Sequence, residues 1–313
     1  MVENVIIIGS GPAGLSAALY TSREGFNPLL IRGTSSGGQL LLTTDVENYP
    51  GYEKIAGPEL IRLMEAQAIK FGTRFVEGDI TKVELNSKPI KVYANDTVYQ
   101  TLSLIISTGA SSKWIGLPSE KNFTGRGVSS CATCDGAFFK NKEVVVVGGG
   151  DTAMEDSLFL TRFASSVTIV HRRDAFRASK IMQQRVFANP KIKVLWDTTV
   201  EEITGDRKVT GVRLKNLKTG SLMQMRIDGV FVAIGHQPNS SIFAGQLKLD
   251  DQGYIITKDD VLTDIDGVYV AGDVADRFYK QAVTAASAGV KAALRAREYL
   301  SMLKFEEEQK ANK

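Results

Sequence analysis

The sequence has few of the residues that build disulfide frameworks, metal centres or membrane helices. Among its 313 residues there are two cysteines and two histidines, too few for a disulfide scaffold in a chain of this length. The longest purely apolar runs have four or five residues, far below the ~18 that cross a membrane. The amino-terminal segment also lacks the basic region and long apolar run of a secretory signal peptide. We therefore expect a cytoplasmic protein with no membrane partner.

The charges give no indication of an extended anionic partner. Lysine and arginine number 38, aspartate and glutamate number 35, and the formal net charge is +3. Both signs are interspersed along the chain, so nucleic acid is not predicted as a partner. Glycine is in excess, at 29 of 313 residues, which is about 9% against a norm of ~7%. Clusters of glycine mark places where the backbone must approach something closely.

The first glycine cluster joins a strand-like segment to a helix-like one. Residues 4–8 form a strand-like run in which residues 5–8 are all β-branched. Gly9-Ser-Gly11-Pro-Ala-Gly14 follows at once, and residues 15–23 are rich in helix formers. In such a unit the glycines allow a tight turn, close approach to a pyrophosphate, and packing of the helix on the strand. The N–H groups at the start of the helix then bind the phosphates. This context predicts a dinucleotide site, and a tight turn without a ligand is the alternative.

One usual contact is missing from this first site. An acidic residue about 20 positions further on, at the end of the second strand, normally binds the ribose hydroxyls. Here the second strand, residues 28–31, ends in Arg32. The ribose is therefore expected to be held in a different way.

The same pattern returns 139 residues later, counting from Gly9 to Gly148. The second turn, Gly148-Gly-Gly150-Asp-Thr-Ala153, has alanine in place of the third glycine, which the fingerprint allows. Its second strand, residues 167–170, ends in His171-Arg172-Arg173, and Arg177 follows four residues later. Guanidinium groups bind phosphate bidentately, so the cluster favours NADPH over NADH. A solvated basic turn is the alternative.

Two dinucleotide folds in one chain suggest two dinucleotides. FAD with NADPH is the usual pairing, because a nicotinamide delivers hydride and a flavin accepts it. Further strands are expected at residues 88–93, 102–107, 209–214, 229–234 and 267–271, with a long helix over residues 281–303. The polar tail, residues 306–313, is expected to fray. Glycine, serine and proline interrupt the pattern near residues 111–116 and 239–245, which predicts that the chain crosses between domains there.

The two cysteines lie three positions apart, as Cys131-Ala-Thr-Cys134, and Asp135 follows them. A zinc site would need two more soft ligands, and no further cysteine exists. A pair of inert buried thiols is a second alternative. A redox dithiol fits best, because this spacing lets both sulfurs reach disulfide geometry and makes a thiolate available for attack. Asp135 could act as a general acid or base, and a turn cap is an equally natural role.

Taken together, these motifs resemble those of a known family, the low-molecular-weight, bacterial-type thioredoxin reductases. The resemblance covers essentially the whole chain, and its motifs occur in the family's order. They are the segments 9–14, 37–40, 47–51, 108–110, 131–136, 148–153 and 171–177, and Ala271-Gly272-Asp273 with Gln281-Ala282. The resemblance implies two Rossmann-like α/β domains, with the NADPH domain, residues 113–245, inserted into an FAD domain formed by residues 1–112 and 246–313.

The resemblance also implies roles for individual residues. FAD would be held by the first glycine turn, by residues 32–39, by Asn48, and by the segment from Gly272 to Gln281, with Asp273 on the ribityl chain. NADPH would lie on the second turn, with the arginine cluster on its 2′-phosphate. The cofactor-binding residues expected are Gly9, Gly11, Pro12, Ala13, Gly14, Arg32, Gly37, Gly38, Gln39, Leu40, Asn48, Thr108, Gly109, Gly150, Asp151, Thr152, Ala153, His171, Arg172, Arg173, Arg177, Ile234, Gly235, Gly272, Asp273, Lys280, Gln281 and Ala282.

The activity implied is the transfer of two electrons from NADPH, through FAD and the Cys131–Cys134 disulfide, to the disulfide of oxidised thioredoxin, with Asp135 as proton donor. No metal is implied, and a homodimer is expected. The main alternative is an NADPH-dependent reductase of another dithiol protein, such as a component of a peroxiredoxin system. A ferredoxin- or flavodoxin-type NADP reductase would not need the cysteine pair, a dithiol oxidase would not need the arginine cluster, and a redox-sensing module would not turn over.

Overall fold

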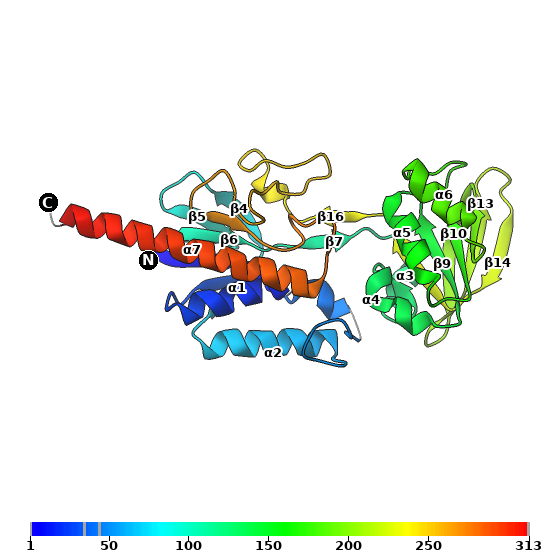
Figure 1. The fold of residues 1–313 in the computed structure, drawn as a ribbon, viewed down its shortest axis with the longest axis horizontal. Coiled ribbons are helices and arrows are strands. Elements are labelled where there is room, and N and C mark those ends of the chain that lie inside the picture. The colour runs from blue at the N-terminus through cyan, green and yellow to red at the C-terminus, as the bar shows by residue number, and fades with distance from the viewer. Residues whose placement is uncertain (1, 34–35, 43–44, 312–313) are drawn as a thin grey trace. The chain divides into compact units, whose positions relative to one another are not determined.

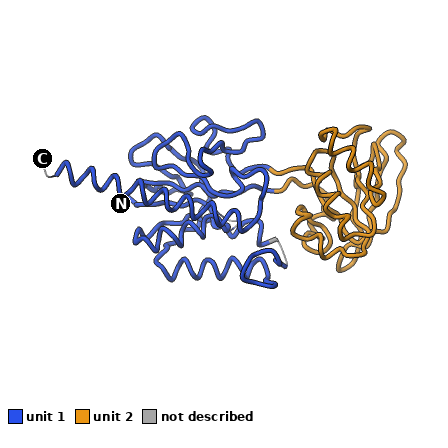
Figure 2. The backbone as a smooth tube through the Cα atoms, viewed as in Figure 1, with its two compact units in different colours: residues 1–111, 237–313 blue, residues 112–236 orange. Residues whose placement is uncertain are grey.

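The structure, a computed structural model, describes residues 2–33, 36–42 and 45–311. Thr34 and Ser35, which fall in the segment expected to hold FAD, lie outside the described residues. The chain divides into two compact units, Met1–Ser111 with Gln237–Lys313, and Ser112–His236, which have different colours in Figure 2. The second unit is thus inserted into the chain of the first, as the resemblance implied. Each unit has its own sheet and core.

Unit 1 is built on a mixed sheet in the order β3-β2-β1-β6-β5-β4, with β17 paired to β6. Strands β1, β2, β3, β6 and β17 are parallel to their neighbours, whereas β4, β5 and the first part of β6 form an antiparallel meander. The bounds are Val2–Ile8 for β1, Leu29–Arg32 for β2, Arg74–Glu77 for β3, Ile80–Glu84 for β4, Ile90–Ala94 for β5, Thr97–Ile106 for β6 and Val268–Val270 for β17.

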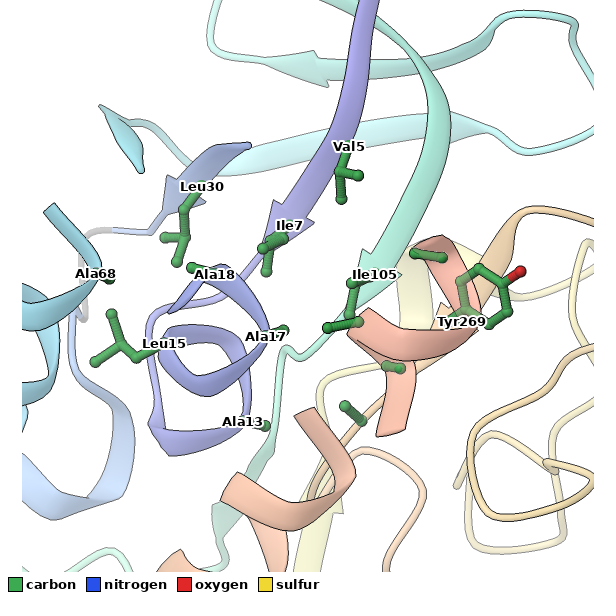
Figure 3. Close-up of a cluster of buried hydrophobic side chains, with 14 of the residues drawn as sticks. Val5, Ile7, Ala13, Leu15, Ala17, Ala18, Leu30, Ala68, Ile105 and Tyr269 are labelled. Carbon is green, nitrogen blue, oxygen red and sulfur yellow. The ribbon is translucent and has the colours of Figure 1, made fainter. Parts of the chain in front are cut away.

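Helices α1 (Pro12–Arg23), α2 (Gly57–Lys70) and α7 (Ala282–Ala311) lie along the sheet of unit 1 (Figure 1). Buried side chains of β1, β2 and β6, such as Val5, Ile7 and Leu30, point toward Leu15, Ala17 and Ala18 of α1 (Figure 3). α7 approaches α1 closely, because a Cβ added at Gly289 would lie 2.0 Å from the carbonyl oxygen of Ala13. Glycine and alanine residues at this contact therefore let α7 pack closely on α1, the helix that follows the first glycine turn.

Unit 2 repeats the arrangement with a five-stranded parallel sheet in the order β11-β10-β9-β15-β8. These strands are Ile192–Leu195, Ser166–Val170, Glu143–Gly148, Gly229–Ala233 and Val128–Ser129. Their central residues are almost wholly apolar and buried, as expected for parallel strands covered on both faces. Helix α5 (Asp151–Leu160) follows β9, and α6 (Lys180–Ala188) connects β10 to β11.

The remaining elements are shorter or peripheral. An antiparallel sheet of β12 (Thr198–Gly205), β13 (Val209–Asn216) and β14 (Leu222–Arg226) belongs to unit 2, together with α3 (Pro118–Phe123) and α4 (Ala132–Asp135). β7 (Ala110–Ser112) and β16 (His236–Pro238) form a two-stranded sheet where the chain passes between the units. The 3₁₀ turns are η1 (Gly38–Leu42), η2 (Gly136–Phe139) and η3 (Ser241–Phe243).

The second domain boundary differs from the sequence expectation, which placed residues 237–245 in the inserted domain. These residues belong to unit 1. The N–H of Asn239 donates to the carbonyl of Gly109 at 3.0 Å, and its side-chain amide donates to the carbonyl of Thr108 at 2.9 Å. Phe243 is fully buried in the core beside β17. The glycines and serines that interrupt the pattern here therefore mark a loop of unit 1.

The expectation that residues 306–313 fray was wrong over residues 306–311, because α7 continues to Ala311. The segment contains glutamate, glutamine, lysine and alanine but neither glycine nor proline, so its composition favours helix. In the described residues, no helix is both long and apolar enough to span a membrane.

Candidate active site

The first glycine turn has the backbone geometry of a pyrophosphate cradle. Gly9 follows β1 with φ of +105°, and a Cβ there would lie 2.3 Å from the carbonyl oxygen of Ser107. A Cβ at Gly14 would lie 1.9 Å from the carbonyl oxygen of Gly9. A Cβ at Gly11, by contrast, would meet no atom within 4 Å. Two of the glycines thus close the turn against strand and helix, and the third leaves the backbone open to an approaching ligand.

The start of α1 has no side chain to satisfy its N–H groups. Gly11 is the N-cap, it provides no side-chain hydrogen bond, and Pro12 and Ala13 follow without an acidic residue in the first turn. Unpaired N–H groups and the positive end of the helix dipole attract an anion. The segment after β2 returns to this turn, because the N–H of Gly37 donates to Ser10 Oγ at 2.9 Å. Gly38, at the start of η1, lies beside Gly11, and a Cβ there would be 3.7 Å from the Gly11 Cα.

Asp273 provides an unsatisfied polar atom in the same unit. It follows Gly272 in the turn after β17, and its Oδ1 is buried with no hydrogen-bond partner in the part of the chain that the structure describes. The pKa of Asp273 is raised from 3.8 to about 6, mainly by burial and in part by the nearby Asp276, while Lys280 opposes the rise. A buried acceptor of this kind costs free energy unless a donor reaches it. A polyhydroxyl chain of a bound cofactor would supply such a donor.

The segment after Asp273 leads to the start of α7. Asn48 Nδ2 donates to Gln281 Oε1 at 3.2 Å, which links two residues expected to hold FAD that lie 233 positions apart. Lys280 has φ of +49°, and its N–H donates to Asp276 Oδ2 at 3.2 Å. Ala282 is the first residue of α7. Gln39 and Leu40 lie in η1, and Thr108 and Gly109 follow β6, where Thr108 Oγ1 donates to the Asn239 carbonyl at 2.7 Å.

Arg32 ends β2, where an acid was expected. Its Nη1 lies 2.5 Å from Glu65 Oε1 of α2, and its Nη2 lies 3.1 Å from Glu77 Oε1 at the end of β3. The guanidinium carbon also lies 5.4 Å from the centre of the Phe75 ring. Glu65 and Glu77 were not expected from the sequence, because nothing in the local pattern marks residues 33 and 45 positions away.

The second glycine turn repeats the first with different contacts. A Cβ at Gly148 would lie 2.4 Å from the Ala233 carbonyl oxygen, whereas one at Gly150 would meet nothing within 4 Å. Gly150 is the N-cap of α5 and, like Gly11, offers no side-chain hydrogen bond. Asp151 accepts from the N–H and the hydroxyl of Ser179, both at 2.8 Å. Thr152 and the buried Ala153 follow in the first turn of α5.

The loop after β10 is tied to this turn. The N–H groups of Arg177 and Ala178 both donate to the Gly149 carbonyl, at 2.8 and 3.2 Å. Arg172, Arg173 and Arg177 are exposed, and in the described part of the chain no carboxylate forms an ion pair with them. Three guanidinium groups without an acidic partner, beside an uncapped helix start, suit the phosphates of a pyridine nucleotide.

His171 has a different position from the arginines with which the sequence grouped it. It is buried, its Nε2 lies 3.0 Å from the Ala175 carbonyl, and its ring packs against Phe176 and Trp196. A Cβ at Gly149 would lie 2.2 Å from the ring. Burial lowers the pKa of His171 below 6.5, against the effect of backbone hydrogen bonds. A neutral buried ring is suited to positioning the turn rather than to binding phosphate by charge.

Cys131 and Cys134 form a disulfide with 5.3 Å between their Cα atoms. Cys131 is the N-cap of the short helix α4, and its Sγ accepts the N–H of Cys134 at 3.2 Å. Its own N–H donates to Ser129 Oγ at 3.0 Å. Cys131, Cys134 and Asp135 are each partly exposed. The inert-thiol alternative required two buried thiols, and the structure has a disulfide instead.

The end of β15 carries the last residues of the expected set. Ile234 is 40% exposed, and Gly235 has φ of +100°, with its carbonyl accepting the Lys113 N–H at 2.9 Å. A Cβ at Gly235 would meet nothing within 4 Å. Among the residues that the structure describes, no group of three or more histidine, cysteine or acidic side chains is arranged to hold a metal ion.

Taken residue by residue, the chain fits two dinucleotides. Each unit has a glycine turn with one open glycine and an uncapped helix start. Unit 1 adds the unsatisfied carboxylate oxygen of Asp273, and unit 2 adds three arginines and the disulfide. Ser107, whose hydroxyl donates to the Ile8 carbonyl at 2.7 Å and so fastens the first turn to β6, was not expected. Its only sequence signal is its place beside Thr108.

Comparisons with known proteins agree with this arrangement. The profile of the pyridine nucleotide-disulphide oxidoreductase family matches residues 3–289. A thioredoxin reductase of Rickettsia conorii is 54% identical over 307 residues, covering 96% of this chain and 99% of that protein. A thioredoxin reductase of Streptomyces coelicolor is 49% identical over 317 residues, covering 100% and 98%.

Solved structures give the same result for the fold. The crystal structure of thioredoxin reductase from Streptococcus pyogenes superposes with a TM-score of 0.93 at 42% identity, covering 96% of this chain and 99% of that one. Thioredoxin reductase from Giardia duodenalis gives a TM-score of 0.91 at 41% identity, covering 95% and 98%. These similarities confirm the fold class predicted from the sequence.

Proposed function

The chain belongs to the pyridine nucleotide-disulphide oxidoreductase family, and within it to the thioredoxin reductases, and from this premise we propose that it reduces thioredoxin with electrons from NADPH. Membership of the family implies a flavin and a pyridine nucleotide. We propose that these are FAD, bound in unit 1, and NADPH, bound in unit 2. The observation that carries the proposal is the Cys131–Cys134 disulfide in a chain with two uncapped glycine turns.

FAD is proposed to lie on the first turn. The N–H groups of residues 13 and 14 at the start of α1 would bind its pyrophosphate, and Asp273 would accept hydrogen bonds from its ribityl hydroxyls. Support comes from the buried Oδ1 of Asp273, which has no hydrogen-bond partner among the described residues. The Asn48–Gln281 hydrogen bond and Lys280 fix the segment around the flavin end. Gly37 to Leu40, Thr108, Gly109 and Ala282 line the same binding site.

NADPH is proposed to lie on the second turn. Its pyrophosphate would be held by the N-cap Gly150 and by Asp151, Thr152 and Ala153 in the first turn of α5. The arginine loop would bind the 2′-phosphate. The Gly149 carbonyl, which accepts from Arg177 and Ala178, keeps this loop beside the turn. His171 positions the loop from within the core, and Ile234 and Gly235 line the nicotinamide end.

The chemistry of the disulfide follows from its two sulfurs. When bound, a flavin passes two electrons from a reduced nicotinamide to a disulfide. With two protons, these electrons convert Cys131–Cys134 to a dithiol. One thiolate then attacks a sulfur of the thioredoxin disulfide, which forms a mixed disulfide and releases one thioredoxin thiolate. The second cysteine of the pair then attacks the sulfur of the first within the mixed disulfide. The Cys131–Cys134 bond reforms, and the remaining thioredoxin sulfur leaves as a thiolate that takes up a proton.

Two groups in unit 2 assist this exchange. The N–H of Cys134 points at Cys131 Sγ, so it stabilises negative charge on that sulfur when the bond opens. Asp135, directly after the pair, is proposed to hold the proton that the leaving thiolate takes up.

We further propose that the protein works in the cytoplasm as a homodimer; sedimentation of the holoprotein tests the dimer.

The proposal is tested with the purified protein. It should be yellow with bound FAD, and it should oxidise NADPH when thioredoxin is added. Thioredoxin, a peroxiredoxin and ferredoxin are offered in turn at equal concentration. Fast turnover with thioredoxin supports the proposal, whereas a preference for the peroxiredoxin would support the alternative reductase. A colourless protein that cannot be reconstituted with FAD would contradict both.

A further inference from the structure

Arg32 occupies the position at which dinucleotide sites of this type carry an acid. The usual carboxylate accepts hydrogen bonds from the ribose hydroxyls. Arginine has five N–H donors and no acceptor, so it cannot make the same contact. The position remains part of the site, because the chain that leaves Arg32 returns to the glycine turn, where Gly37 donates to Ser10.

The guanidinium of Arg32 is not available to bind phosphate as a fork. Its two terminal nitrogens are engaged by Glu65 at 2.5 Å and by Glu77 at 3.1 Å. Two carboxylates around one guanidinium leave the cluster with a formal charge of −1, which repels a phosphate. Glu65 comes from α2 and Glu77 from β3, so two separate elements hold the side chain in one orientation.

One donor of Arg32 remains unsatisfied. Its Nε is buried, and no acceptor in the described residues reaches it. A buried N–H without an acceptor is costly, yet the two ion pairs prevent the side chain from turning away. An uncharged oxygen is therefore the acceptor that suits this atom, because a charged one would meet the two carboxylates.

We propose that Arg32 Nε donates to a ribose hydroxyl oxygen at the adenosine end of the bound flavin dinucleotide, with Glu65 and Glu77 as positioning residues. A sugar hydroxyl accepts as readily as it donates, so a donor replaces the usual acceptor without loss of the contact. The proposal rests on the proposed binding of FAD to unit 1. It makes Arg32 a determinant of the adenosine end alone.

The experiment compares flavin ligands that do and do not contain adenosine. The holoprotein is stripped of flavin, and the apoprotein is titrated with FAD and with FMN by flavin fluorescence; ADP is then used to displace FAD. The variant is Arg32→Lys, which keeps a charge between the two carboxylates but has no Nε. Arg32→Ala is the second variant. Arg62→Ala is the matched control, because Arg62 lies on α2 and pairs with Glu59 in the exposed part of the helix.

Arg32→Lys is expected to weaken the binding of FAD and of ADP by the same factor, roughly three- to tenfold, which is the value of one hydrogen bond. FMN binding and the melting temperature of the apoprotein should stay at the values of the control variant. Equal weakening of FAD and FMN would overturn the proposal and leave Arg32 a structural brace. Unchanged FAD and ADP binding by both variants would also overturn it. A wild-type apoprotein that binds no flavin would defeat the proposed function itself, a result distinct from the other two.

Discussion

The two glycine turns have similar backbone geometry and differ in the side chains around the end of the strand that follows. Both follow a buried parallel strand, both have one glycine open to solvent, and both start a helix without a side-chain cap. At the first, Arg32 lies between two carboxylates. At the second, Arg172, Arg173 and Arg177 have none within ion-pair distance among the described residues. We therefore propose that arginine binds a sugar in the first setting and a phosphate in the second.

The two turns also differ at their third small residue. Gly14 has no room for a methyl group against the Gly9 carbonyl, whereas Ala153 carries one and is buried. The acid in the loop after the last parallel strand is a further difference, since Asp273 follows Gly272 in unit 1 but His236 follows Gly235 in unit 2. On the proposed function, the shared motif would provide the phosphate cradle and the neighbouring elements would decide which nucleotide each turn holds.

The largest effect is expected from a substitution that removes the disulfide and leaves both glycine turns intact. Cys134→Ser should reduce NADPH-dependent reduction of thioredoxin by a factor on the order of 10³ or more, because a unit that acts together fails when one member is removed. Reduction of the flavin by NADPH, followed at its absorbance maximum, should remain. Lys208→Ala, a substitution of an exposed residue elsewhere in unit 2, serves as the control and should stay near wild type. Equal loss of both reactions in the serine variant would remove the cysteines from the electron path.

The next effect distinguishes the third position of the two turns. Gly14→Ala places a methyl group 1.9 Å from a backbone oxygen, so it should cost about 3 kcal/mol or more and abolish FAD retention, measured as flavin per chain after purification. Ala153→Gly only removes a methyl group, and should cost about 0.5–1 kcal/mol. If Gly14→Ala retained full flavin, the first helix would not be closed on its turn as described.

Asp273 in unit 1 should give the protein's stability a specific dependence on pH. Asp273 in the apoprotein has a pKa near 6 against an ordinary 3.8, so the native state keeps its proton where the unfolded chain loses it. Stability therefore falls as pH rises from about 4 to about 6, by roughly 3 kcal/mol for a shift of about two units. Asp273→Asn should remove this fall. Urea unfolding of both apoproteins at several pH values checks it, and a difference that does not change with pH would refute it.

The smallest effect concerns the exposed arginines of unit 2. Arg172→Ala combined with Arg177→Ala should raise KM for NADPH by about one to two decades, because charge-assisted phosphate contacts are worth ~1.5–3 kcal/mol. KM for NADH should change little. Steady-state kinetics with both nucleotides provides the measurement, and Arg207→Ala, a substitution of an exposed arginine elsewhere in unit 2, is the control. Parallel changes with NADPH and NADH would assign the arginines to another role.

Sequence patterns were sufficient to predict those features whose residues lie close together in the chain. The two strand–turn–helix units, the arginine loop and the cysteine pair each lie within about 35 residues, and their side chains act through the backbone next to them. The partners of Arg32 could not be predicted, because Glu65 and Glu77 reach it through the packing of α2 and β3. The buried position of His171 depends on its packing against Phe176 and Trp196, which no local pattern in the sequence marks.

The second boundary was misplaced for a similar reason. Glycine, serine and proline near residue 240 give the composition of a linker, but Asn239 is tied to Thr108 and Gly109, 131 and 130 positions earlier. Hydrogen bonds over such separations leave no periodic signal. The helical end of α7 was missed because polarity was read as disorder, although every residue from 306 to 311 is compatible with helix.

The close packing of α7 on α1 sets an order for events during synthesis. Gly289 and the strand β17 that completes the sheet leave the ribosome last, while Ala13 and β6, which they pack against, leave early. Unit 2 contains all its own strands and is finished long before. Since domains fold as units when their chain is complete, the inserted unit should be native while the amino-terminal third still waits for the carboxyl-terminal helix. A nascent chain arrested before residue 282 should therefore resist protease in its middle and remain open at its start.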